Sequence, residues 1–421
     1  MTGQEAQAYI WSLGWERHVP GLTRIRALME LLGNPQKRLR FIHVAGTNGK
    51  GSVCACLASV LTAAGYRVGL NTSPHLERFH ERIQVDGVPI PDEALGRLTE
   101  EVQKAAERMP EAPTEFEVIT AIAFLYFMQE KCQIVILETG LGGALDASNV
   151  IDTPEAAVLT AMGIDHGAIL GRTQKEIAQA KAGIIKPGGT VVSMGGCQEA
   201  DAVFRTVCRE RGAELIELDR SRLSRPELSL EGSRFSFSPY TDLRISLAGC
   251  CQAVNAATAI TTLEALGRKG WRISSEALRK GLSSVRWPGR FEVLGRNPTV
   301  ILDGAHNPQG IAAAAESFRT LCPGRKAVLL LGILADKAAE EMLDPLIPLA
   351  SKAVVLRPES PRALDPLTLC DLLKARGIPA KPAVTPEEGV QEALREAGPG
   401  GMVLCLGSLY LVGQVRPLLL C

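Results

Sequence analysis

The fold is decided by the stretch Phe41-Ile42-His43-Val44-Ala45-Gly46-Thr47-Asn48-Gly49-Lys50-Gly51-Ser52. Its apolar start predicts a buried strand, its glycine-rich middle predicts a turn, and the apolar pattern that follows predicts a helix. Glycines let backbone N–H groups converge on an anion, and a helix N-terminus adds positive potential. A lysine at this place can reach the outer phosphates of a nucleotide. The stretch therefore predicts a phosphate site formed by Gly49, Lys50, Gly51 and Ser52.

The alternative for this stretch is a plain glycine turn between a strand and a helix. Two positions differ from the common phosphate-binding loop. Val44 stands where its first glycine would be, and Gly51 precedes the hydroxyl of Ser52. The strand before the turn and the helix after it favour nucleotide binding over the plain turn.

Composition limits the classes of protein that this chain can belong to. The 421 residues are 46% hydrophobic and 22% charged, and 46 basic residues balance 46 acidic ones. These values predict a soluble globular protein of two or three domains, and the zero net charge argues against a dedicated nucleic-acid binder. Neither a leader pattern nor an apolar run of membrane-spanning length is present, which predicts a cytoplasmic protein without membrane association. The eleven scattered cysteines, with no C-x-x-C pair, predict reduced core thiols.

Three further predicted strands end in polar residues. The run 67–72 leads into Ser73-Pro74, and the buried run 133–138 ends in Glu138. A carboxylate at the end of such a strand can bind a metal ion that is itself bound to phosphate. The alternative is that Glu138 is an acid at a helix N-terminus or in a solvated loop. The run 156–160 leads to Asp165-His166, and His166 taken alone is more often a hydrogen-bonded structural histidine than a metal ligand.

The rest of the chain predicts a second α/β domain. Residues 1–40 have helical spacing, and 234–238 with 243–247 predict antiparallel strands around a turn. The run 295–298 has the composition of a linker, which predicts domains at 1–294 and 295–421. After it, strands are predicted at Thr299–Leu302, Ala327–Leu331, Ala353–Leu356 and Met402–Leu406. Asp303 and His306 follow the first of these strands, at the edge where α/β sheets bind ligands.

Taken together, these segments resemble the folylpolyglutamate synthase/dihydrofolate synthase family of the Mur ligase superfamily over nearly the whole chain. The matching segments, in chain order, are Gly46–Ser52, Thr72–Leu76, Glu81–Ile83, Glu138–Asn149, Asp165–His166, Lys181–Gly188, Pro288–Glu292, Asp303–Pro308 and Gly407–Gly413. The resemblance implies an α/β fold, with an N-terminal P-loop ATP-binding domain of the Mur ligase type and a smaller C-terminal Rossmann-like domain.

The resemblance also implies a reaction. Members of the family use ATP to join L-glutamate to the γ-carboxylate of a reduced folate, and some also join it to dihydropteroate. A carboxylate is a poor electrophile for an amine, so it is first phosphorylated to an acyl phosphate. The expected ligands are therefore ATP, Mg²⁺, L-glutamate and a reduced folate or dihydropteroate, and the expected oligomeric state is a monomer.

Individual roles follow from the same resemblance. It implies that Ser73 and Glu138 hold Mg²⁺ and that His166 holds a second Mg²⁺. Lys50 would neutralise the transferring phosphoryl group, and Lys181 would be carbamylated, which turns a cation into an oxygen-donor anion suited to a hard metal. Without the resemblance, Lys181 reads as a solvated helix lysine. The remaining assignments are Asn255, Arg290 and Asp303 to ATP and His306 to the reacting centre.

Two other functions fit parts of the sequence. A muramyl-peptide ligase shares the phosphate loop, but the chain has no extra UDP-binding domain ahead of Phe41. A nucleotide-gated switch or binding module also shares it. Against that reading, no asparagine is followed by lysine, so the guanine-reading N-K-x-D pattern is absent from the sequence.

Overall fold

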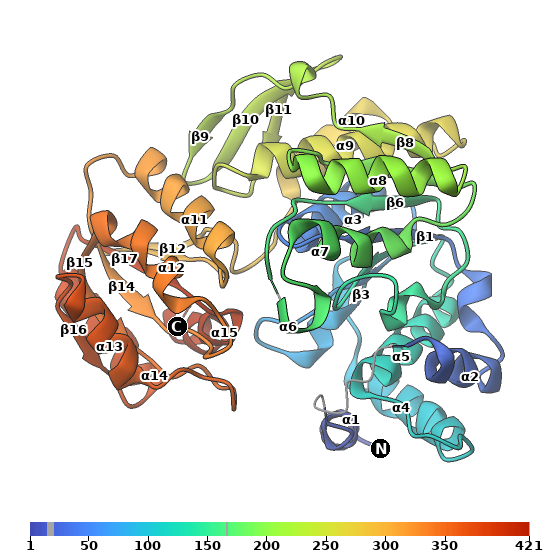
Figure 1. The fold of residues 1–421 in the computed structure, drawn as a ribbon, viewed down its shortest axis with the longest axis horizontal. Coiled ribbons are helices and arrows are strands. Elements are labelled where there is room, and N and C mark those ends of the chain that lie inside the picture. Colours follow the sequence, from blue (N-terminus) through green and yellow to red (C-terminus); the bar gives the residue numbers. More distant parts are fainter. Residues whose placement is uncertain (15–20, 166, 421) are drawn as a thin grey trace. The chain divides into compact units, whose positions relative to one another are not determined.

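The structure is a computed structural model that describes residues 1–14, 21–165 and 167–420 (Figure 1). It divides into two compact units. Unit 1 comprises Met1–Leu223, Phe237–Tyr240 and Val254–Val285, and unit 2 comprises Ser224–Ser236, Thr241–Ala253 and Arg286–Cys421. The domain boundary between residues 294 and 295 stays a prediction.

Unit 1 is built on a sheet of eight strands in the order β4-β3-β2-β5-β1-β6-β7-β8. The six strands from β2 to β8 in that order pair in parallel, and β3 and β4 add an antiparallel edge beyond β2. The strands are β1 (Phe41–Ala45), β2 (Val68–Asn71), β3 (Ile83–Val85), β4 (Val88–Pro89), β5 (Ile134–Glu138), β6 (Ala156–Leu159), β7 (Thr190–Ser193) and β8 (Glu214–Glu217). The first strand therefore lies between β5 and β6, and their carboxyl ends share one edge.

Alternation along β1 places Phe41, His43 and Ala45 on one face of the sheet and Ile42 and Val44 on the other, and all five residues are buried. Phe41 packs edge-on against Phe124 of α5 at 5.4 Å between ring centroids. Ala45 belongs to an apolar cluster with Phe204 of α8, and α7 and α8 lie side by side in Figure 1. Helices α3 and α10 are also in contact. The Ser59 hydroxyl of α3 donates to the Gly281 carbonyl of α10 at 2.7 Å. A strand buried on both faces is what its unbroken apolar sequence predicts.

Four helices of unit 1, α1, α5, α7 and α10, begin at a residue whose side chain caps the helix. Thr114 caps α5 and Thr173 caps α7, each in a capping box with a glutamate three residues later. The α-helices are α1 (Gly3–Ser12), α2 (Thr23–Leu31), α3 (Lys50–Ala63), α4 (Asp92–Ala106), α5 (Glu115–Gln129), α6 (Gly167–Leu170), α7 (Gln174–Lys181), α8 (Gln198–Glu210), α9 (Gln252–Arg268) and α10 (Ser275–Ser284). Short 3-10 helices are η2 (Pro35–Arg38), η3 (Phe79–Arg82), η4 (Ala147–Val150), η5 (Ala182–Ile184) and η6 (Arg220–Arg222). Helical structure in the first forty residues is confirmed where they are described.

Unit 2 contains a sheet of six strands in the order β12-β13-β17-β14-β15-β16, parallel except for β12. Its strands are β12 (Glu292–Arg296), β13 (Thr299–Leu302), β14 (Ala327–Leu331), β15 (Ala350–Val355), β16 (Ala380–Pro382) and β17 (Met402–Leu406). Its helices are α11 (Pro308–Leu321), α12 (Ala339–Leu343), η7 (Asp344–Leu349), α13 (Pro366–Ala375), α14 (Pro386–Ala397) and α15 (Leu409–Leu419). The α/β structure predicted for the C-terminal part of the chain is confirmed.

Two local expectations are wrong. The run 295–298 is not a linker, because β12 continues to Arg296 and turns directly into an antiparallel pairing with β13. A small sheet of β9 (Glu227–Ser229), β10 (Gly232–Phe237) and β11 (Tyr240–Ile245) contains the two predicted strands, but their limits differ from the predicted ones. Its turn is shorter than predicted, so the last of these strands begins at Tyr240 and not at residue 243. In both places the strand pairing includes residues that composition assigned to a turn.

Among the described residues, no helix is both long enough and apolar enough to cross a membrane. The ten described cysteines are all free thiols, and seven of them are buried. This agrees with the core positions predicted for most of them.

Candidate active site

The predicted phosphate loop connects β1 to α3 and is held in place by the neighbouring strand β6. The backbone N–H groups of Thr47 and Asn48 donate to the Ala161 carbonyl at 2.9 and 3.1 Å. The Thr160 hydroxyl donates to the Asn48 carbonyl at 2.8 Å. Lys50 and Gly51 then lie in the first turn of α3, where backbone N–H groups have no partner inside the helix. An anion at this helix start would meet these N–H groups and the positive end of the helix dipole.

Gly49 is the residue at which the loop turns into the helix. Its φ of +84° lies in the left-handed region, which glycine adopts without a steric penalty. A Cβ atom at this position would come within 2.7 Å of the Asn255 Oδ1 atom. Asn255 is buried in α9, so the sequence-predicted ATP residue lies directly against the phosphate loop.

Lys50, Glu138 and Ser73 come together at the carboxyl ends of β1, β5 and β2. The Lys50 Nζ atom lies 3.9 Å from Glu138 Oε1 and 3.3 Å from the Thr47 carbonyl oxygen. The Ser73 backbone N–H donates to Glu138 Oε2 at 3.2 Å. Glu138 is 5% exposed, so this carboxylate is buried next to a lysine and a hydroxyl-bearing residue. The structure thus brings three of the predicted site residues into one cluster.

Lys181 is buried beside the same loop, and not solvated as its helical position alone would suggest. It is 5% exposed. Its Nζ atom donates to the Gly46 carbonyl at 2.7 Å. Burial, followed by the positive charge of Lys50, lowers the pKa of Lys181 to about 7, while the carboxylates of Asp165 and Asp146 oppose that shift. A lysine in this environment is partly neutral near physiological pH.

The predicted site residues of unit 2 form a second cluster at the end of β13. Asp303 accepts hydrogen bonds from the backbone N–H groups of Phe291 at 2.9 Å and Ala305 at 2.8 Å. Burial raises the pKa of Asp303, and the nearby Arg290 guanidinium opposes that rise. His306 Nδ1 lies 2.7 Å from the Gly304 carbonyl oxygen. That contact assigns a proton to Nδ1, because a carbonyl oxygen can only accept.

His166, the predicted ligand of a second metal, lies outside the described residues. Its neighbour Asp165 is described and contributes to the electrostatic environment of Lys181. Among the described residues, no group of three or more His, Cys, Asp or Glu side chains is arranged to hold a metal ion.

Thr160 supports the site and was not singled out from the sequence. Its hydroxyl bonds the Asn48 carbonyl, and a Cβ on Gly46 would come within 1.9 Å of its Oγ1 atom. A hydroxyl residue directly after a predicted parallel strand was the available signal. The pairing of β6 with β1, which places Thr160 beside the loop, could not be derived from the sequence pattern.

Comparison with known protein families shows the class of protein to which this chain belongs. The family described as "Mur ligase middle domain" matches residues 44–263. The family described as "Mur ligase, glutamate ligase domain" matches residues 289–409. The phosphate loop, Glu138 and Lys181 all lie within the first match, and Arg290, Asp303 and His306 lie within the second. The fold and the site thus define a ligase of the Mur type.

Relatives narrow the class further. The chain is 39% identical to the dihydrofolate synthase/folylpolyglutamate synthase of Bacillus subtilis over 94% of both chains. It is 37% identical to the folylpolyglutamate synthase of Lacticaseibacillus casei, over 100% of this chain and 99% of the relative. A crystal structure of Mycobacterium tuberculosis folylpolyglutamate synthase complexed with ADP and AMPPCP superimposes with a TM-score of 0.90, at 32% identity and 99% coverage of both chains. The chain belongs to the folylpolyglutamate synthase/dihydrofolate synthase family of ATP-dependent Mur ligases.

Proposed function

We propose that this protein joins the amino group of L-glutamate to the γ-carboxylate of a reduced folate, with ATP as the source of energy. The observation that carries the proposal is the meeting of Lys50, Glu138 and Lys181 at the phosphate loop. Lys50 lies 3.9 Å from Glu138, and Lys181 is bonded to the first residue of the loop. The partly buried Lys50 at a helix N-terminus is suited to the charge of a nucleotide triphosphate, and the buried Glu138 carboxylate beside it is suited to the accompanying metal ion.

The chemistry proceeds in two balanced steps. A carboxylate oxygen of the folate forms a bond to the γ-phosphorus of ATP while the bond to the bridging oxygen breaks, which releases ADP. The glutamate amine then attacks the acyl carbon, loses a proton and expels inorganic phosphate. Lys50 neutralises the transferring phosphoryl group, and the first N–H groups of α3 bind the phosphate oxygens. The protein's contribution is positioning and charge more than covalent participation.

The donor set near the loop fits Mg²⁺. The Glu138 carboxylate and the Ser73 hydroxyl are hard oxygen ligands, and Mg²⁺ takes one or two such protein ligands along with water and substrate phosphates. Ser73 and Glu138 would hold the ion. When bound, Mg²⁺ offsets the negative charge of the phosphates. We also propose His166 as a ligand of a second Mg²⁺, on the basis of the family resemblance.

We propose that Lys181 carries a carbamate. Carbon dioxide adds only to a neutral amine, and the lowered pKa of about 7 supplies that form near neutral pH. The product is an anion, which reverses the sign of the charge beside the loop. The Lys50 ammonium would favour this anion, and so would a metal ion held by Ser73 and Glu138.

In unit 2, Arg290 and Asp303 are proposed to contact ATP and His306 the reacting centre. We further propose a monomer with small-molecule substrates and no nucleic-acid partner. A second activity, ligation of the first glutamate to dihydropteroate, is favoured by the Bacillus subtilis relative, whose name includes both synthases.

A substrate panel tests the proposal. Purified protein receives ATP, Mg²⁺ and labelled L-glutamate with tetrahydrofolate, dihydropteroate or a UDP-muramyl peptide. Labelled product from tetrahydrofolate supports the main proposal, and labelled product from dihydropteroate supports the second activity. Ligation to the muramyl peptide alone would overturn both.

A further inference from the structure

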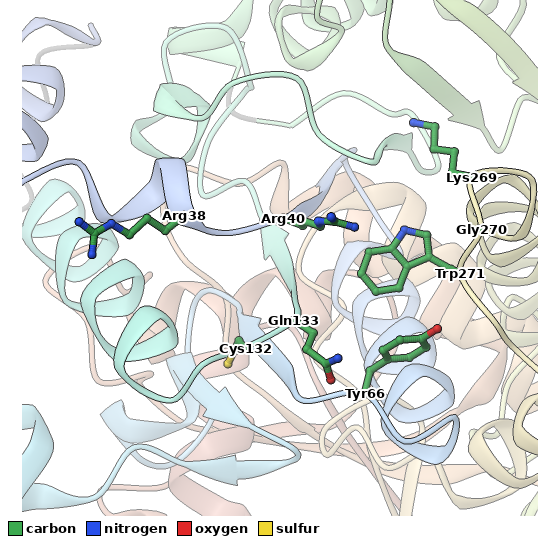
Figure 2. A pocket seen from close by; sticks show the side chains of 8 residues that line it. All are labelled: Arg38, Arg40, Tyr66, Cys132, Gln133, Lys269, Gly270 and Trp271. Carbon is green, nitrogen blue, oxygen red and sulfur yellow. The ribbon is translucent and has the colours of Figure 1, made fainter.

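Unit 1 has a hollow at the edge of its sheet opposite the phosphate loop. Its walls come from residues that precede three adjacent parallel strands: Arg40 before β1, Tyr66 before β2 and Gln133 before β5. Lys269 and Trp271, which follow α9, close it, and Arg38 lies on its rim (Figure 2). Because the strands run in parallel, their starts share one edge and their ends, with the phosphate loop, share the other. The hollow is therefore distinct from the candidate active site.

The hollow has the size and the lining of a small-molecule site. Its volume is about 490 Å³, within the range of ligand pockets of roughly 300–1,000 Å³. Aromatic rings form one wall, where Tyr66 meets Trp271 edge-on at 5.0 Å between ring centroids. The indole N–H of Trp271 lies 3.4 Å from Glu155 Oε2, which fixes the orientation of the ring.

The charge of the lining has one sign. Three of the lining side chains are cationic and none is acidic. The Arg40 guanidinium stands over the Trp271 ring at 5.7 Å, and Figure 2 shows it reaching toward that ring, while the Arg38 guanidinium points outward along the rim. Lys269 donates to the Glu155 carbonyl. The Glu155 carboxylate is the nearby counter-charge, and its contact with Trp271 directs it to the indole N–H.

Gln133 supplies a neutral donor to the same wall. Its Oε1 atom accepts the backbone N–H of Arg67 at 2.8 Å, which fixes the amide and identifies Nε2 as the group that can donate. The Arg67 side chain, by contrast, is committed to Asp86 and Glu130. The adjoining hollow on the other side of Trp271 includes Glu276 beside Lys280 and Arg272, so it lacks the single sign of charge.

We propose that this hollow binds a small polyvalent anion that carries phosphate or carboxylate groups. Arg40 is the main contact, because a guanidinium pairs with such groups through two parallel hydrogen bonds and is held in place by the indole. Lys269 and the Gln133 amide contribute further donors, and Arg38 adds long-range attraction from the rim. An anion between these cations also relieves their mutual repulsion.

Two probes that share this chemistry test the proposal, namely inorganic tripolyphosphate and γ-linked triglutamate. Each is titrated into the full chain by calorimetry, with tryptophan fluorescence as a second readout. We expect saturable binding that Arg40→Gln weakens about tenfold and Lys269→Gln several-fold, since a hydrogen bond to a charged group is lost. Arg40→Lys should fall between Arg40→Gln and wild type, Arg38→Gln should change little at about 150 mM salt, and Trp271→Phe should remove the fluorescence change.

Matched controls separate the hollow from the phosphate loop. Lys280→Gln removes one charge from the adjoining hollow and should leave the affinity within about twofold of wild type. Lys50→Ala should keep the Arg40-dependent binding. Tighter binding of tripolyphosphate identifies a phosphate ligand, and tighter binding of triglutamate identifies a polycarboxylate. The proposal is overturned if neither probe binds saturably, if the Arg40→Gln/Lys269→Gln protein binds as wild type does while melting normally, or if Lys50→Ala abolishes all binding.

Discussion

The Nζ atom of Lys181 donates a hydrogen bond to the carbonyl oxygen of Gly46 at 2.7 Å. An amine at the C-terminal end of α7 is thereby joined to the first residue of the phosphate loop. The contact links two segments that are 135 residues apart in the chain. It also places a second lysine close enough to Lys50 for the charge of Lys50 to lower the pKa of Lys181, after the larger effect of burial. The position of the phosphate loop and the pKa of Lys181 therefore depend on each other.

Carbamylation of Lys181 should depend on pH in a defined direction. With a pKa of about 7, the amine is protonated below that pH and neutral above it. The neutral fraction rises from about one-tenth at pH 6 to about nine-tenths at pH 8. Protein from which dissolved carbon dioxide has been removed should recover activity when bicarbonate is added. The recovered activity should be larger at pH 8 than at pH 6. A carbon-13 carbamate signal should appear in wild type and not in Lys181→Met; equal signals in both proteins would contradict the assignment.

Replacement of Lys50 by alanine should reduce ligase activity by about 10²–10³-fold, since one charged contact to the reacting phosphate is removed. Its melting temperature should stay near that of wild type, because the side chain makes one hydrogen bond to the loop and one ion contact at 3.9 Å. Lys175→Ala, an exposed change on α7, is the matched control and should keep full activity. A folded Lys50→Ala protein with wild-type turnover would exclude this lysine from the site.

Gly49→Ala should weaken ATP binding for two reasons, the left-handed φ and the 2.7 Å approach to Asn255. Gly65→Ala is the control for the cost of a left-handed alanine outside the phosphate loop, because Gly65 has a φ of +88° and a Cβ atom there would meet nothing within 4 Å. That control should lose about 1 kcal/mol of unfolding free energy and retain its ATP affinity. Calorimetric titration with ATP measures the difference. Equal ATP affinity in both variants would mean that the contact with Asn255 is irrelevant to the nucleotide.

Arg290→Gln should shift the acid limb of the pH–activity profile to higher pH. Burial already raises the pKa of Asp303, and Arg290 opposes that rise. Without the cation the pKa rises further, so the Asp303 carboxylate is protonated over a wider range of acid pH. Arg296→Gln removes an exposed arginine of the same strand region, which pairs with Glu231, and should leave the profile unchanged. An unmoved acid limb in Arg290→Gln would refute a role for this pair.

Local pattern was sufficient for the elements that carry the site. The strands 299–302, 327–331 and 402–406 have the predicted limits, because unbroken apolar runs mark them. Glu138 is found at the end of a fully buried strand, as its apolar sequence indicated. The sequence pattern did not predict which of these residues lie close together in space. The order β2-β5-β1-β6 brings Ser73, Glu138 and Thr160 to one edge, and strand order depends on packing between segments distant in the chain.

The sequence pattern did not predict the burial and contacts of residues whose surroundings come from distant parts of the chain. Lys181 lies on a polar helix, and its burial follows from the contact with the loop, which spacing does not encode. The same holds for Arg40 and Trp271, which meet only because β1 begins beside the end of α9 in space. The strand β12 was missed because glycine, asparagine and proline near its end suggested a linker, whereas pairing with β13 continues through Arg296.

The central claim is ligation through an acyl phosphate formed on the substrate carboxylate. It is tested most directly with folate labelled with oxygen-18 in its γ-carboxylate, incubated with the protein, ATP, Mg²⁺ and L-glutamate. Transfer of one labelled oxygen to each inorganic phosphate, together with ADP and the glutamylated product, is the predicted result. Product formation with unlabelled phosphate, or with AMP in place of ADP, would contradict the account.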